Sequence, residues 1–243
     1  MQLKFSQIRV WFAMSTLALL AACGGGGGGG TNASAEGFWG GTSSTGYNVQ
    51  MVILENGETW GLYTSGSTLY GALYGNTTTT GNAVSGSGSD FNLLSRTVSP
   101  GTYSGSVSEK STIYLAAGSS SFNGTYGSTY DQPASLSAAA GVYTGQALTG
   151  STAAQSITAT ISANGALSIP ATLGCAVSGT ATPRATGKNI FNLSVTFNGS
   201  NCALGNGGTA TGILYYDSVH RQILAMGMNP GKSDGFIAFG TKP

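Results

Sequence analysis

The chain has 243 residues, and only 7% of them are Asp, Glu, Lys or Arg, against about 25% in typical soluble proteins. Its formal net charge is +1, and it lacks the basic stripe that binds phosphate backbones, so we expect no nucleic-acid partner. The 11 Tyr, 9 Phe and 3 Trp are spread along the sequence. This excludes general disorder, because disordered chains lack aromatic residues.

Residues 1–22 predict a signal peptide. Lys4 and Arg9 give a positively charged start, and a mostly apolar run follows over residues 10–20. This run is too short for a membrane-spanning helix, which needs about 20 residues, but it suits the apolar centre of a signal peptide. An ordinary secretory signal cut near Ala22 is the alternative interpretation.

The signal ends in Leu20-Ala21-Ala22-Cys23, which is similar to the lipobox of bacterial lipoproteins. We expect Cys23 to become the first mature residue and to carry acyl chains such as palmitate, which anchor a protein stably when two or more are present. Gly24 follows the cysteine. An Asp at this position tends to retain enterobacterial lipoproteins in the inner membrane, so the resemblance implies the outer membrane.

Residues 23–36 predict a flexible tether. Seven consecutive glycines, residues 24–30, would lose more backbone entropy on ordering than a helix or strand restores. A glycine-rich coil of this length spans roughly 20 Å. We reject a phosphate-binding loop, because such a loop follows a strand and precedes a helix, whereas this run follows a signal peptide.

From residue 37 onward, apolar and polar residues alternate with the period of a β-strand. Val49, Met51 and Ile53 share one face, and Asn56-Gly57 is a strong hairpin signal. The polar run over residues 77–82 predicts a turn. The other strands expected in the first half, which we place at 37–140, are residues 59–64, 69–75, 91–94, 102–107, 112–116 and 121–126.

Residues 130–140 predict a short helix or an ordered crossing between two halves. The second half, 141–243, starts with Gly-Val-Tyr-Thr-Gly at residues 141–145, which echoes Gly-Phe-Trp-Gly-Gly at residues 37–41. Asn164-Gly165 likewise echoes Asn56-Gly57. The strands expected here are residues 157–161, 175–182, 190–197, 209–216, 222–226 and 235–240.

The mature chain shows no helical periodicity longer than two turns. Short strands with regular turn signals predict an all-β, antiparallel fold, either an up-and-down barrel or a sandwich, with two similar halves as one possibility. A barrel would leave no unpaired strand edge, which suits a chain with few charges. Whether the halves form one barrel or two stays open at this point.

Three cysteines are present, at positions 23, 175 and 202. With Cys23 lipidated, an even pair remains in the oxidising cell envelope, so we predict a Cys175–Cys202 disulfide. Two unpaired, buried thiols are the alternative.

Catalytic groups are sparse. The single histidine, His220, lies close to Asp217 and Ser218, but three residues on one tight turn seldom reach triad geometry. The acidic residues are scattered, so we expect no metal site, no cofactor and no enzymatic activity. A pair of carboxylates of the glycosidase type stays open, although no feature favours it. We expect Trp39 and Trp60 to belong to the core.

Three features together carry a resemblance to a known group. They are Cys23 with its glycine tether, the Gly-x-aromatic-x-Gly starts at Gly37 and Gly141, and the C-terminal segment 234–242 with Phe239-Gly240-Thr241-Lys242. The arrangement resembles the β-barrel surface lipoproteins of the transferrin-binding-protein B and factor-H-binding-protein type. The resemblance implies a barrel on the outer membrane, and it assigns no ligand-binding residue.

We therefore expect a non-enzymatic outer-membrane lipoprotein, displayed at the cell surface, that binds a host or envelope protein or glycan. One alternative is a lipocalin-like or avidin-like carrier of a small ligand, because Gly37-Phe38-Trp39 resembles the Gly-x-Trp start of lipocalins. Another alternative is a structural or inhibitory protein that faces the periplasm.

Overall fold

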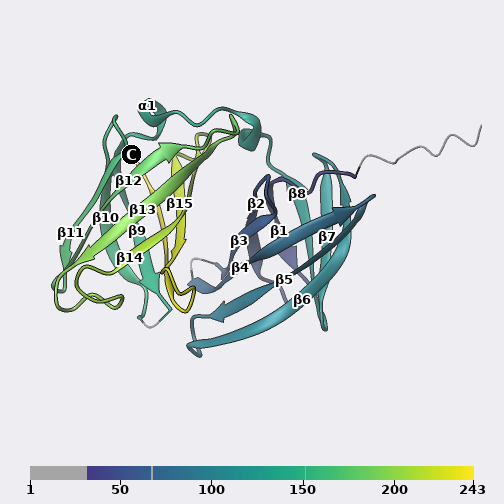
Figure 1. Cartoon of the computed structure of the whole chain (residues 1–243), viewed down its shortest axis with the longest axis horizontal. Coiled ribbons are helices and arrows are strands. Elements are labelled where there is room, and N and C mark those ends of the chain that lie inside the picture. The colour runs from purple at the N-terminus through teal and green to yellow at the C-terminus, as the bar shows by residue number, and fades with distance from the viewer. Residues whose placement is uncertain (1–31, 67, 151) are drawn as a thin grey trace, which may run out of the picture. The chain divides into compact units, whose positions relative to one another are not determined.

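The computed structural model describes residues 32–66, 68–150 and 152–243, which belong to one compact unit (Figure 1). The predicted signal peptide 1–22 and the predicted lipidation of Cys23 lie outside the described residues, as do the glycines of the predicted tether 23–36. The last residues of that tether do not behave as predicted: the Ala33 N–H donates to the Gly81 carbonyl, and Ala35 is buried in the core of barrel 1. The described part is almost entirely β-structure and forms two closed barrels. The predicted all-β, antiparallel barrel fold is confirmed, with two barrels in place of one barrel or a sandwich.

Barrel 1 is an up-and-down meander in which each strand pairs with the next and the last pairs with the first. All pairings are antiparallel. Its strands are β1 (Gly37–Ser43), β2 (Asn48–Ile53), β3 (Glu58–Ser65), β4 (Thr68–Thr80), β5 (Ala83–Asn92), β6 (Thr97–Ser108), β7 (Thr112–Ala117) and β8 (Ser120–Tyr126).

Barrel 2 repeats this plan, with β16 closing on β9. A 3₁₀ turn, η1 (Ser128–Asp131), and one helical turn, α1 (Leu136–Ala139), connect the barrels, as the short helix or crossing predicted for residues 130–140 anticipates. The strands of barrel 2 are β9 (Gly141–Thr149), β10 (Gln155–Ile161), β11 (Ala166–Thr172), β12 (Cys175–Pro183), β13 (Ile190–Asn198), β14 (Thr209–Asp217), β15 (Gln222–Met228) and β16 (Gly235–Thr241).

The echoed Gly-x-aromatic-x-Gly starts occupy the same place in both barrels. Trp39 is fully buried and its Nε1 donates to the carbonyl of Ala35, four residues earlier, at 2.9 Å. Tyr143 is also buried, and its Oη donates to the carbonyl of Ala139, again four residues earlier, at 2.6 Å. In each barrel a large ring thus fills the interior and ties the entering chain to the first strand.

Each barrel closes at a pair of facing glycines. Gly41 of β1 lies opposite Gly124 of β8, and Gly145 of β9 lies opposite Gly240 of β16. A Cβ on Gly41 would lie 1.9 Å from the Asn123 carbonyl oxygen, and a Cβ on Gly145 would lie just as close to a backbone oxygen of β16. The seam strands therefore approach more closely than any side chain permits, which explains the glycines in the motif.

The predicted turn over residues 77–82 is wrong, because β4 continues to Thr80. Thr77 is buried, and its hydroxyl bonds the hydroxyls of Thr59 and Tyr103, each at 2.6 Å. Beside it, Gly86 of β5 faces the Tyr103 ring, which a Cβ would meet at 2.2 Å. β5 therefore carries glycine where apolar residues normally mark a strand, because rings from neighbouring strands fill the interior.

A second apolar cluster lies between the barrels, formed by residues that point outward from each. We call it the interface cluster. On barrel 1 it includes Val52 and Trp60, which face each other on β2 and β3. On barrel 2 it includes one apolar row in cross-strand register, Ile213, Met226, Ile237 and Leu148. β2, β14 and β15 are consequently buried on both faces for part of their length.

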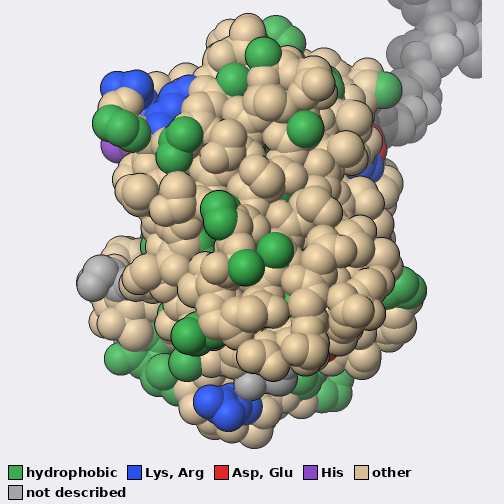
Figure 2. All heavy atoms as spheres, turned by 90° about the vertical axis from the view of Figure 1, so that its left-hand side faces the viewer, with side chains coloured by type: hydrophobic (Ala, Val, Ile, Leu, Met, Phe, Trp, Pro, Cys, Tyr) green, Lys and Arg blue, Asp and Glu red, His purple; other side chains and the backbone are tan. Residues whose placement is uncertain are grey.

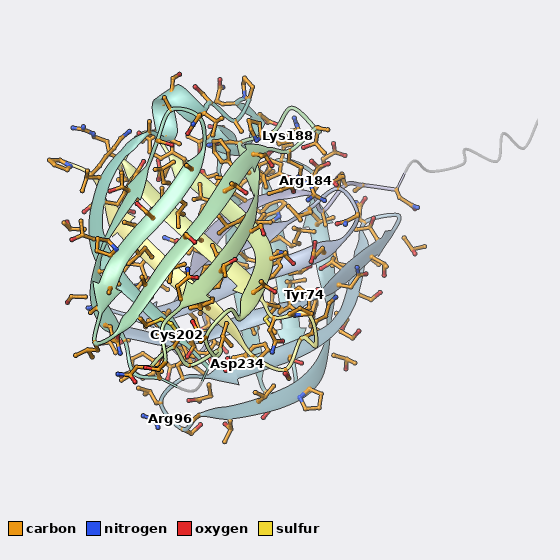
Figure 3. The ribbon with its side chains drawn as sticks, turned by 60° about the vertical axis from the view of Figure 1, so that its left-hand side comes forward. Tyr74, Arg96, Arg184, Lys188, Cys202 and Asp234 are labelled. Carbon is orange, nitrogen blue, oxygen red and sulfur yellow. A yellow bond between two sulfur atoms is a disulfide. The ribbon has the colours of Figure 1, made fainter. Side chains whose placement is uncertain are left out.

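The predicted Cys175–Cys202 disulfide is present, with a Cα–Cα distance of 4.8 Å. It joins the start of β12 to the loop after β13. Figure 3 shows Cys202 at the end of barrel 2 opposite to Lys188. Elsewhere the surface is sparsely charged: on the face shown in Figure 2, Lys and Arg lie near the margins and uncharged atoms fill the centre.

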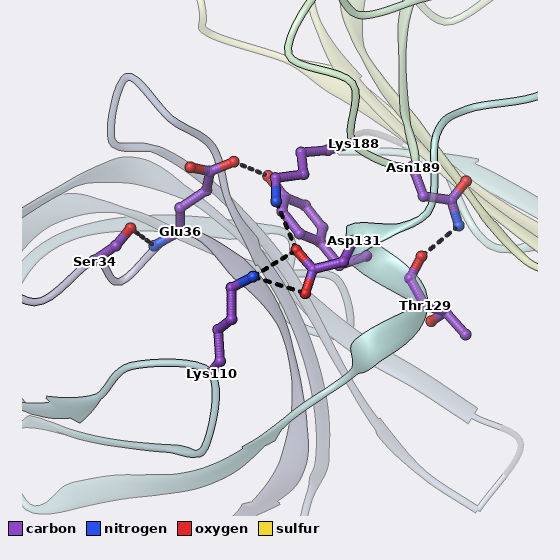
Figure 4. Close-up of polar contacts among 8 residues, drawn as sticks. Ser34, Glu36, Lys110, Thr129, Asp131, Lys188 and Asn189 are labelled. Atoms are coloured by element: carbon purple, nitrogen blue, oxygen red, sulfur yellow. Dashed lines mark hydrogen bonds and ion pairs between the residues drawn. The ribbon is translucent and has the colours of Figure 1, made fainter.

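Ion pairs gather where the connecting segment meets both barrels (Figure 4). Lys110, from the turn between β6 and β7, and Lys188, from the loop between β12 and β13, both bind Asp131 of η1, at 3.0 and 2.6 Å. The hydrogen bond from Lys188 holds the pKa of Asp131 below its ordinary value, and Lys110 adds to this effect. Nearby, Arg184 of barrel 2 binds both carboxylate oxygens of Glu55 of barrel 1 at 2.6 to 3.0 Å.

The barrel seam generates a first prediction. Gly41→Ala should destabilise the protein by about 3 kcal/mol, because the new methyl group forces the seam strands apart. Gly101→Ala is the matched control in the same barrel, since its Cβ meets nothing within 4 Å. Urea unfolding followed by circular dichroism measures both; equal stabilities for the two variants would contradict the account of the seam.

The Glu55–Arg184 ion pair generates a second prediction, about the dependence of stability on pH. The hydrogen bond from Arg184 lowers the pKa of Glu55 below its ordinary value of 4.5, so the pair stabilises the fold above that pH and the effect is lost as pH falls through the folded pKa. Glu55→Gln should lower the free energy of unfolding by about 0.5–1 kcal/mol at pH 7. It should have no effect at a pH low enough to protonate Glu55 in both the folded and the unfolded wild-type protein. Unfolding at pH 7 and in acid measures this, with Glu109→Gln, which removes a carboxylate without an ion pair, as control.

Candidate functional site

The candidate site is a cleft of about 970 Å³ between the two barrels, near the upper end of the range typical of ligand sites. Outward faces of β1, β2 and β3 form one wall, and outward faces of β9, β10, β14, β15 and β16 contribute to the other. Its polar lining residues are Asn48, Gln50, Thr64, Thr144, Gln146, Ser156, Thr158, Thr172, Asp217, Gln222 and Thr241.

On barrel 2 the cleft is lined by a polar row in direct cross-strand register. The row runs over five neighbouring strands, and it consists of Asp217, Gln222, Thr241, Thr144 and Thr158. Since neighbouring strands lie about 4.8 Å apart, this row offers hydroxyl and amide groups at regular intervals on one face.

The outward faces change from polar to apolar along each strand. A mixed row lies two positions along the strands from the polar row, and it includes Phe239 and Gln146, which face each other. Two residues further lies the apolar row of the interface cluster, with Ile237 opposite Leu148. The same strands therefore contribute to the interface cluster at one end and to the wall of the cleft at the other.

The wall on barrel 1 follows the same gradient. Asn48, Gln50 and Val52 alternate along the outward face of β2, from the cleft to the interface cluster. Gln50 lies opposite Leu62 of β3, and Asn48 lies opposite Thr64. Both walls thus end in hydrogen-bonding groups, uncharged except for Asp217, above an apolar floor.

Asp217 is the one charged residue among the described residues that line the cleft. Its Oδ1 accepts from the backbone N–H groups of Val219 and His220, and its Oδ2 lies 2.6 Å from His220 Nδ1. The carboxylate is therefore largely occupied in ordering the turn between β14 and β15. The cleft as a whole is polar and close to neutral.

Aromatic rings form the base of the cleft. Phe38 of β1 stacks on Tyr215 of β14, with ring centroids 4.6 Å apart and planes 7° from parallel. Burial raises the pKa of Tyr215 to about 12, and its hydroxyl bonds that of Thr129 in the connecting segment. Phe38 and Phe239 stay partly exposed. The base therefore combines fixed rings with accessible apolar edges.

The residues considered for catalysis are not assembled into a reactive site. His220 is mostly exposed, and its Nδ1 is hydrogen-bonded to Asp217. Over the described ranges, no group of three or more His, Cys, Asp or Glu is placed to hold a metal ion. Within the same ranges, no helix has the length and apolar character needed to cross a membrane.

The two tryptophans expected in the core are both buried, in different places. Trp39 lies inside barrel 1. Trp60 points outward into the interface cluster, where it packs on Tyr74 with ring centroids 4.5 Å apart. Burial between two barrels and burial inside one give the same period-two pattern, so the sequence cannot separate them.

Barrel 2 also contains a small apolar cavity of about 110 Å³. It exists because Ala225, Ala238 and Ala147 face one another in register on three adjacent strands, all pointing inward. In barrel 1 the rings of Trp39, Tyr63 and Tyr103 occupy the interior, and Gly71 and Gly86 leave room for two of them. The cavity is smaller than an engineered cavity of about 150 Å³ that binds benzene.

Comparison of the chain with protein-family models, with curated proteins and with solved structures gave no match. The resemblance to transferrin-binding-protein B and factor-H-binding protein therefore stays a prediction.

The barrel 2 cavity generates a prediction about packing. Ala238→Val, which adds methyl groups into the cavity, should leave stability unchanged or raise it by up to about 1 kcal/mol. Ala181→Val, at a buried position that does not line the cavity, should cost about 1–3 kcal/mol through overpacking. Urea unfolding separates the two; equal losses for both would show that the cavity is not free space.

Proposed function

We propose that this protein is a non-enzymatic lipoprotein, anchored in the outer membrane through acyl chains on Cys23 and displayed at the cell surface, and that it binds a host or envelope macromolecule in the cleft. The signal, the lipobox and the glycine tether of residues 1–36 support the anchor. The cleft supports the binding role.

The observation that carries the binding role is the unused polar lining of the cleft. The amides of Asn48, Gln50, Gln146 and Gln222 make no side-chain hydrogen bond to any described residue, and at least three of them are markedly exposed. Concave sites with an apolar base and a few convergent polar groups are the usual sites of recognition. Scattered surface amides would not meet in one concave region.

A small-ligand carrier is the second candidate function, and the apolar cavity inside barrel 2 favours it. At about 110 Å³ the cavity has room for a short alkyl end and not for a ligand of ordinary size. Native mass spectrometry of the purified protein, before and after Ala238→Val, tests it. A bound small molecule that the variant loses would move the carrier role to first place.

The anchor generates a prediction in cells. Cys23→Ser should abolish labelling of the protein by radioactive palmitate and release it from the membrane fraction. The control is the double variant Cys175→Ser/Cys202→Ser, which removes the other two cysteines and should keep the label. A label that survives Cys23→Ser would contradict lipidation at this residue.

The side of the outer membrane on which the barrels lie is tested with a C-terminal epitope tag and proteinase K digestion of intact cells. We expect the tag to be lost while a periplasmic marker survives, because the barrels lie outside. Survival of the tag until the outer membrane is permeabilised would place the barrels in the periplasm and would overturn the surface-display part of the proposal.

A further inference from the structure

We infer that the ligand of the cleft is a neutral oligosaccharide. The inference rests on the proposed function, which places a binding site in the cleft, and adds the chemical class of the ligand. Two observations carry it: the hydrogen-bonding groups that line the cleft, and the near absence of charge among the described residues that line it.

The lining groups match the hydroxyl rim of a sugar ring. A primary amide both donates and accepts hydrogen bonds, and so does each hydroxyl of the ligand. Most other amides of the described chain are already used; Asn189, for example, is buried and donates to the carbonyls of Thr129 and Tyr216. The amides of Gln146 and Gln222 have no such internal role and face the cleft.

The near absence of charged side chains in the cleft argues against anionic and cationic ligands. Phosphate groups and acidic sugars are recognised through Arg or Lys, and no Lys or Arg occurs among the described residues that line the cleft. A cationic ligand would need free carboxylates, whereas Asp217 already holds the turn that follows it. An uncharged, hydroxyl-rich ligand fits this environment best.

A protein segment is a poorer fit than a glycan. Extended peptides usually bind by adding a strand to a free sheet edge. Both described barrels are closed, but β10 pairs with β11 only at Thr160 and Ile161, so the first residues of β10 keep a free edge. A peptide added there would not reach Gln222, which lies three strands away on β15. Sugar rings instead present an apolar C–H face, which the exposed edges of Phe38 and Phe239 can contact at the base of the cleft. The polar row from Asp217 to Thr158 then faces the hydroxyl rim.

The test uses the protein extracted from membranes in a neutral detergent, with neutral oligosaccharides as probes. Hexamers of β-1,4-glucose, α-1,4-glucose, N-acetylglucosamine and N-acetyllactosamine separate plant, storage, cell-wall and host-surface sources, and a polygalacturonate hexamer is the acidic comparison. Titration calorimetry should detect one neutral class and not the acidic one. Failure of every neutral class at millimolar concentration would overturn the inference.

Two matched variants locate the binding. Thr158→Arg places a long cation in the cleft and should weaken binding at least tenfold. Thr160→Arg, on the same strand and also exposed but outside the cleft, should not change it. Gln146→Ala/Gln222→Ala should also weaken binding about 30-fold, since each of the two lost hydrogen bonds contributes about 1 kcal/mol, with exposed Gln132→Ala as its control. Unchanged binding by Thr158→Arg would overturn the assignment to the cleft.

Failure of the inference and failure of the proposed function give different results. Membrane or host extracts are treated with periodate, which destroys sugars, and passed over wild-type and Thr158→Arg protein. If a ligand is captured after periodate by the wild type alone, the cleft binds something other than a glycan and the inference fails while the proposed function holds. If neither protein captures anything before or after treatment, both fail.

Discussion

The dry contact between the outer faces of the two barrels is the constraint on which the rest of the structure depends. A closed barrel normally turns polar residues outward, yet here Val52, Trp60, Met226 and Ile237 point away from their own barrels and into the interface cluster. β2, β14 and β15 must therefore be apolar on both faces where they meet. This requirement places long apolar runs in a chain that otherwise alternates.

The cleft follows from the same contact. Where the outward rows leave the interface cluster, they change to Gln, Asn and Thr: Gln50 precedes Val52 along β2, and Gln146 precedes Leu148 along β9. Apart from Asp217, the described cleft lining carries no charge, and ion pairs concentrate where the connecting segment joins the barrels, around Asp131. The interface thus holds two walls of mostly uncharged side chains beside each other.

Local patterns predicted much of the fold. An antiparallel barrel with two similar halves was predicted from the period-two alternation, the Asn-Gly turns and the repeated aromatic residue at positions 39 and 143. The disulfide was predicted because an even pair of cysteines in the oxidising cell envelope is expected to pair. β5 was missed because Gly86 and Gly88 stand at inward positions where apolar residues normally mark a strand, and Gly86 makes room for the Tyr103 ring. The cleft was missed because its residues come from many strands and meet only through cross-strand register. The apolar runs at 51–54, 213–216 and 223–226 were the available signal of burial on both faces.

Hydrogen exchange with the disulfide intact and reduced tests most directly whether the interface couples the two barrels. Reduction of Cys175–Cys202 acts on barrel 2 alone and should cost about 3–4 kcal/mol. The informative peptide is β7 of barrel 1, which contributes no residue to the interface cluster. Our account predicts that its amides exchange faster after reduction by a factor of roughly 150 to 800, in parallel with barrel 2. Faster exchange in barrel 2 with β7 unchanged would show two independent barrels and contradict the account.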